Sequence, residues 1–86
     1  HLARWTEAVE AWRPVFAAQA DWSSGNYLAW SLLNLARTSE GDVSALLAEA
    51  EVAVEAALRV APAEMMRYPL DTKAAILLEM GRAAER

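Results

Sequence analysis

The sequence predicts an all-α protein built from antiparallel helical hairpins, and three observations support this fold class. Alanine occupies 20 of the 86 positions, which favours helix because alanine loses no side-chain entropy there. Glycine and proline, which interrupt helices, supply only three residues each. No run of β-branched or aromatic residues alternates with polar ones, so no stretch predicts a strand. We expect four helices with short connections, packed as a four-helix bundle or a helical-hairpin array.

The first helix is expected from Leu2 to Ala20. Its apolar residues recur at three- and four-residue steps on one face, namely Leu2, Trp5, Val9, Trp12 and Phe16. Pro14 removes a backbone hydrogen bond, so we expect a kink or a break near Trp12 and Arg13. The stretch "DWSSGN" then predicts a turn, in which Ser24 or Asn26 caps the next helix.

The second helix is expected from Tyr27 to Thr38, and it has little polar surface. Its polar residues form one narrow stripe, made of Ser31, Asn34 and Thr38. Because the rest of the helix is apolar, neighbours must cover it on two or three sides. The polar stripe either binds the backbone of a partner peptide or forms hydrogen bonds within the fold.

The third helix is expected from Val43 to Ala61, after a cap at Asp42 or Ser44. A second apolar strip beside its main face consists of Val52, Ala56 and Val60. We therefore expect this helix to contact more than one neighbour.

The fourth helix is expected to begin at a cap formed by Asp71 or Thr72 and to run to the C-terminus. Pro69 disfavours helix at Tyr68, which separates this helix from the preceding segment. Gly25 and Gly41 are assigned to turns, and Gly81 to a close-packing contact.

Two stretches resemble a tetratricopeptide repeat (TPR). The segment "WSLLNLAR", from Trp30 to Arg37, is similar to the first helix of the repeat, and "AEVAVEAALRVAP", from Ala50 to Pro62, is similar to its second helix. The stretch "LLEMGRAA", from Leu77 to Ala84, resembles the first helix of a further, partial repeat. The sequence departs from the repeat pattern at Asn34 and Arg37, and its central turn is longer. The resemblance implies a TPR-like solenoid fragment, and the generic four-helix bundle stays the alternative.

The resemblance also implies a non-catalytic protein–protein interaction module that binds a peptide or protein surface in a helical groove. The groove-facing positions that it implies on the second helix are Leu28, Ser31, Leu35 and Thr38. Trp22, in the predicted turn, is a separate candidate for an interface anchor. We expect residues 1–86 to form a single helical domain, which could be a fragment of a longer repeat array.

Two other functions stay open. The surplus apolar faces of the helices could form a homodimer with a structural or accessory role, which predicts a melting temperature that rises with protein concentration. The four tryptophans could line a small-molecule pocket in a regulatory subunit, which predicts saturable quenching of tryptophan fluorescence by an apolar ligand.

Composition and motifs argue against other classes of function. The net charge is −4 and the eight basic residues are scattered, which disfavours nucleic acid as a partner. The longest nearly apolar stretch has ten residues, about half of what spans a bilayer, so we expect a soluble, cytoplasmic protein. The lack of cysteine and the single histidine, His1, predict no metal or cofactor site. The carboxylate pairs, such as Glu51 with Glu55, are expected on a solvated face, so we predict no enzyme activity.

Overall fold

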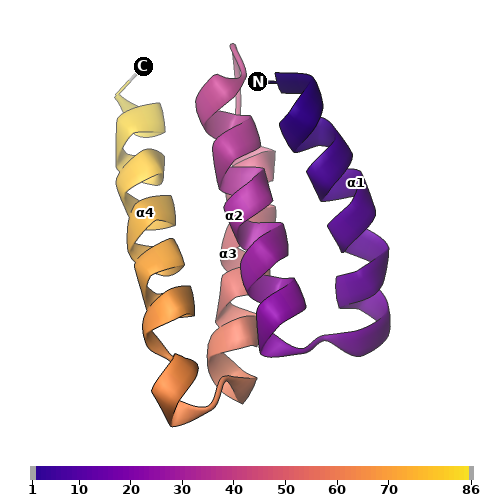
Figure 1. Ribbon diagram of the computed structural model, residues 1–86. Helices are drawn as coiled ribbons and strands as arrows, with labels where there is room; N and C mark the ends of the chain where they lie inside the picture. Colours follow the sequence, from indigo (N-terminus) through magenta and orange to yellow (C-terminus); the bar gives the residue numbers. More distant parts are fainter. Residues whose placement is uncertain (1, 86) are drawn as a thin grey trace.

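The computed structural model describes residues 2–85, so His1, considered above only as a poor metal ligand, lies outside the described part. The described chain forms four α-helices, with no strand among its residues: α1 (Leu2–Gln19), α2 (Trp22–Thr38), α3 (Ser44–Val60) and α4 (Arg67–Ala84). A short 3₁₀ helix, η1 (Ala63–Met65), precedes α4. Figure 1 shows that successive α-helices run in opposite directions. The predicted all-α fold of antiparallel helical hairpins is therefore confirmed.

The central helix of the molecule is α2. It packs against α1, α3 and α4, and α4 lies in the crevice between α2 and α3. The backbone of α1 packs against that of α2 alone. Figure 1 shows this order, with α1 and α4 on opposite sides of α2 and α3 behind it. The expectation that the second helix is covered on several sides is therefore correct.

Small residues allow α2 and α3 to approach closely. A Cβ atom added at Gly25 would lie 2.9 Å from the backbone oxygen of Ala53 and 3.2 Å from Cβ of Ala57. Both alanines are buried, as is Ala50 one turn earlier on α3. Gly25 was assigned to a turn, and the structure corrects this: it lies inside α2 because only glycine fits against the backbone of α3.

The start of α2 is set by a cap that the sequence analysis missed. The carboxylate of Asp21 accepts a hydrogen bond from the backbone N–H of Ser24 at 2.8 Å, which satisfies a donor that has no partner inside the helix. Ala20, with φ of 48°, turns the chain sharply before this cap. The helix therefore begins at Trp22 rather than Tyr27, and neither Ser24 nor Asn26 is its cap.

Two prolines are accommodated inside helices. The helix α1 runs through Pro14 without the break that we considered, and because Pro14 and Glu10 are both exposed, water can reach the carbonyl group that loses its partner. Pro69 is the third residue of α4, where the missing N–H has no partner inside the helix anyway. For this reason α4 begins at Arg67, before the expected start at Asp71 or Thr72.

The hydrophobic core lies where α2, α3 and α4 meet. Its fully buried large side chains include Leu32 and Leu33 of α2, Val54 of α3 and Ile76 of α4. The second apolar strip of α3 is not part of this core, because Val52 and Val60 are 65% and 56% exposed. Gly81 is also not the close-packing contact that we expected, since nothing lies within 4 Å of a Cβ added there.

The two helical glycines provide a matched test of the α2–α3 contact. Gly25→Ala should lower the free energy of unfolding by about 1–3 kcal/mol, because the new methyl group overpacks the interface and outweighs the gain in helix propensity. Gly81→Ala faces open space and should raise it by about 0.5–1 kcal/mol. Urea denaturation followed by circular dichroism at low micromolar concentration measures both. Equal effects of the two substitutions would contradict the proposed contact.

The Asp21 cap predicts a specific acid sensitivity. Hydrogen bonds from the side chain and backbone N–H of Ser24 lower the pKa of Asp21 below its ordinary value of 3.8, so the unfolded chain binds the proton more tightly. The stabilisation is therefore present above about pH 4 and is lost as the pH falls through the lowered pKa. Asp21→Asn keeps the cap but cannot titrate. Its stability should match the parent near neutral pH and fall less in acid, as measured by urea denaturation at both conditions. The same acid loss in both proteins would contradict this assignment.

Candidate functional site

The structure separates the residues that were predicted to face a groove. Leu28 and Ser31 are only 2% and 4% exposed, so both belong to the interior of this chain and neither is available to a partner. Leu35 is half-buried and packs on the core. Only Thr38, at the C-terminal end of α2, is exposed. These four positions therefore do not line a shared groove, because neighbouring helices cover Leu28 and Ser31.

The exposed face of α2 lies one step around the helix, at Tyr27 and Trp30, which are 51% and 42% exposed. The polar stripe beside it is used within the fold: the Asn34 side chain donates to the carbonyl oxygen of Trp30 at 2.9 Å, and the Thr38 hydroxyl donates to that of Asn34 at 3.0 Å. Of the two uses considered for the polar stripe, the structure therefore shows hydrogen bonding within the fold.

Trp22 lies at the opposite end of α2 from Thr38. Its indole stacks on the ring of Tyr68 at the start of α4, with ring centroids 6.3 Å apart and planes inclined by 22°. Trp12 makes a second stacked pair with Tyr27, at 5.0 Å. Trp12 and Trp22 therefore join different pairs of helices at separate places instead of lining one shared pocket.

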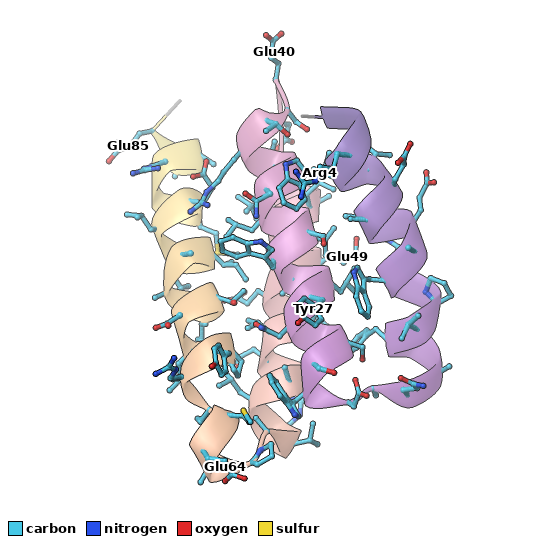
Figure 2. The ribbon with its side chains drawn as sticks, viewed as in Figure 1. Arg4, Tyr27, Glu40, Glu49, Glu64 and Glu85 are labelled. Atoms are coloured by element: carbon cyan, nitrogen blue, oxygen red, sulfur yellow. The ribbon has the colours of Figure 1, made fainter. Side chains whose placement is uncertain are left out.

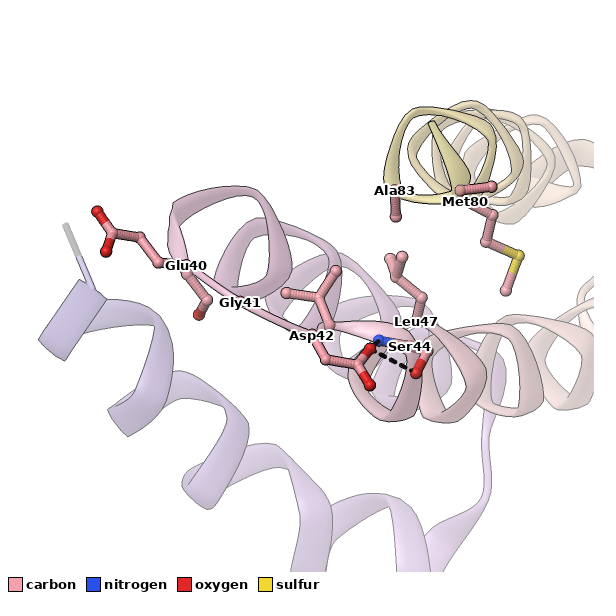
Figure 3. Close-up of a pocket in the computed structure, with 10 residues that line it drawn as sticks. Glu40, Gly41, Asp42, Ser44, Leu47, Met80 and Ala83 are labelled. Atoms are coloured by element: carbon pink, nitrogen blue, oxygen red, sulfur yellow. Dashed lines mark hydrogen bonds between the residues drawn. The ribbon is translucent and has the colours of Figure 1, made fainter. Parts of the chain in front are cut away.

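A groove with a volume of about 860 Å³ lies between the first turns of α3 and the last turns of α4. Figure 3 shows Met80 and Ala83 of α4 facing Leu47 of α3 across it, with the α2–α3 loop at one end. Its lining consists of Ser39, Glu40, Gly41, Asp42, Val43, Ser44, Leu47, Met80, Ala83 and Ala84. None of these residues was predicted as a site residue, although Thr38 directly precedes the loop that forms the rim.

The floor of the groove is apolar and its rim is polar. Val43 and Leu47 are almost completely buried in the core below the floor. At the rim, the carboxylate of Asp42 accepts hydrogen bonds from the backbone N–H and the hydroxyl of Ser44, at 2.9 and 2.7 Å. These bonds hold the pKa of Asp42 below its ordinary value, so the rim carries a fixed negative charge at neutral pH. Gly41, with φ of 83°, allows the loop to turn there.

A buried carboxylate lies next to the groove. Glu79 of α4 is 2% exposed, and its Oε1 is 3.7 Å from Nε of Arg37 on α2 and 3.6 Å from Nη1 of Arg82. A buried charge needs such compensation, because removing it from water is costly. The pair with Arg37 links α4 to the end of α2. Figure 2 draws the side chains of both helices as sticks. The sequence offers only the i,i+3 spacing of Glu79 and Arg82 as a signal for this cluster.

The described residues contain no group of three or more histidine, cysteine, aspartate or glutamate side chains that could hold a metal ion. Among the described helices, none has the length and apolar character needed to cross a bilayer. Comparisons of the chain with protein-family models, with curated proteins and with solved structures return no match. The arrangement of the groove itself is suited to holding an apolar side chain between two helices.

The ion pair behind the groove can be tested with a double-mutant cycle. Arg37→Met should lower the free energy of unfolding by about 1–2 kcal/mol, because it keeps the apolar stem but leaves buried Glu79 with one cation fewer. In a Glu79→Met background the same substitution should change stability by less than about 0.5 kcal/mol. Urea denaturation of the four proteins gives the coupling energy. Equal costs of Arg37→Met in both backgrounds would mean that the two residues do not interact.

Proposed function

We propose that this chain is a non-catalytic protein–protein interaction module that binds a peptide or a protein segment in the groove between α3 and α4. The observation that carries the proposal is the groove itself, with about 860 Å³ of space above an apolar floor. Apolar grooves recur as binding sites for partner segments, which place apolar anchor residues in them.

The floor is suited to an apolar anchor residue of a partner. Met80 is half-buried and unbranched, and methionine adapts its shape to different apolar contacts. Ala83 is small, so it leaves room between the last turn of α4 and Leu47. An apolar side chain entering here would extend the core that Val43 and Leu47 already form.

The rim adds a charge preference. Glu40 and Asp42 carry carboxylates on the loop at one end of the groove, and the chain as a whole has a net charge of −4. The hydroxyls of Ser39 and Ser44 already donate to Leu35 and Asp42, which holds the loop in place. A partner segment with a cationic residue close to its apolar anchor therefore has the complementary charge.

The packing order of the helices supports the TPR-like interpretation. In a stacked array of helical hairpins, each hairpin packs against the preceding one. Here α4 packs against both α2 and α3, and the small residues Ala50 and Ala57 of α3 are buried. The proposed binding site differs from the one first expected, because it lies beside α3 and α4 rather than along Leu28 and Ser31.

Filling the groove provides the test. Peptides selected from a phage-displayed random library against the native chain should contain an apolar anchor with a neighbouring lysine or arginine. Ala83→Phe should weaken the binding of those peptides by about tenfold or more, because the new ring occupies the groove. Fluorescence anisotropy with labelled peptides measures the affinity, and circular dichroism confirms that the helix content is kept.

Ala48→Phe is the matched control, because Ala48 is an exposed residue of α3 outside the groove lining. It should leave peptide affinity unchanged. Peptides that bind the parent and Ala83→Phe equally well would place binding elsewhere and would contradict the proposed site.

A further inference from the structure

The face of α4 that points away from the core carries several exposed apolar side chains. Leu70, Leu77 and Leu78 are 50%, 49% and 56% exposed. Ala74 and Gly81 lie on the same face and are also exposed. The opposite face holds the buried residues of this helix, which are Pro69, Thr72, Ile76 and Glu79. Three of the nine large hydrophobic residues that are exposed in the described chain lie on this one face, namely Leu70, Leu77 and Leu78. This concentration marks the face as an interaction surface.

Large and small residues alternate along this outer face. Leu70 and Leu77 are one heptad apart, and each is followed four residues later by a small residue, Ala74 or Gly81. If a second copy of α4 lies antiparallel against the first, one register places Leu70 over Gly81 and Leu77 over Ala74 of the other copy. Each leucine then fills the space above a small residue, which permits a close helix–helix approach.

The same register pairs opposite charges. It brings Arg67 next to Glu85 of the second copy and Asp71 next to Arg82 of the second copy, and the twofold symmetry repeats both pairs. All four side chains are exposed. In a parallel, in-register arrangement Arg67 and Glu85, which lie near the middle of this face, would each be close to their own equivalents. The charges at the two ends of α4 therefore favour the antiparallel arrangement.

We propose that the outer face of α4 is a self-complementary surface through which two copies of this chain form an antiparallel homodimer. A twofold interface requires one patch that matches itself, and both the leucine spacing and the charge order on α4 meet this requirement. The occupant is therefore a second copy of this chain. The groove lies on the side of α4 that faces α3, so the dimer leaves it open.

The size of the surface sets the expected strength. An 18-residue helix is about 27 Å long, and one such helix face offers less than the roughly 800 Å² per partner of a standard interface. The dimer is accordingly weak and concentration-dependent, with a monomer–dimer equilibrium between micromolar and millimolar concentration.

Charge reversal at the two ends of α4 tests the register without weakening the helix. Arg67→Glu places a negative charge at the N-terminus of α4, and Glu85→Arg places a positive charge at its C-terminus, so both improve the interaction with the helix dipole. In a dimer of either variant alone, however, the end pairs join two glutamates or two arginines. Each variant should therefore dimerise about tenfold more weakly than the parent, as measured by sedimentation velocity over a concentration series.

Mixing the two variants restores both pairs. In a heterodimer of Arg67→Glu with Glu85→Arg, the introduced glutamate lies beside the introduced arginine, and the unchanged Arg67 of one chain lies beside the unchanged Glu85 of the other. Native mass spectrometry of the mixture should therefore show the heterodimer in excess of either homodimer. Arg59→Glu, an equal charge change on the exposed end of α3, is the control and should dimerise like the parent.

Three outcomes overturn the proposal. A parent chain that stays monomeric at millimolar concentration has no such interface. Single variants that dimerise as strongly as the parent place the contact elsewhere, for example on the exposed Val52 of α3. A mixture without excess heterodimer rules out the antiparallel register.

Discussion

The fold depends on the close approach of α2 to α3 at Gly25. The absent side chain at this position lets the backbone of α2 lie against the carbonyl oxygen of Ala53, and the buried alanines of α3 extend the contact along both helices. Because α2 packs against every other α-helix, its close contact with α3 determines where the hydrophobic core forms. The α2–α3 pair forms the crevice that receives α4, and α1 packs against another side of α2.

The docking of α4 in this crevice creates two different surfaces on one helix. Ile76 and Glu79 point inward, where the core and Arg37 hold them. The last turns of α4 stand apart from the first turns of α3, which leaves the groove beside Met80. The remaining face, at Leu77, has no cover within the described chain. One amphipathic helix thus contributes to the core, to a binding groove and to a surface that matches a second copy of itself.

The sequence was sufficient to predict those helices whose ends are marked by residues within the helix itself. The apolar spacing of the third helix placed its ends within one residue of those observed, at Ser44 and Val60. The starts of α2 and α4 were misplaced because a polar cap at Asp21 and a proline in a first turn extend these helices into stretches that look like breaks. The site was missed for a different reason. Whether a residue such as Leu28 faces a groove depends on which helix packs over it. The groove itself exists because α3 and α4 stand apart at one end. Both properties depend on how distant segments pack, so neighbouring residues in the sequence give no signal for them.

The peripheral position of α1 has a consequence for motion. Its backbone contacts only α2, and the exposed ion pair of Arg13 with Glu49 is its one described salt bridge to α3, a type of contact that stabilises little. Hydrogen exchange in α1 should therefore proceed through a local opening of lower free energy than global unfolding, with α2, α3 and α4 still folded. The stacked pair of Trp12 and Tyr27 separates in such an opening, whereas Trp22 on Tyr68 stays in place. The chain thus carries separate spectroscopic reporters for its outermost helix and for its folded centre.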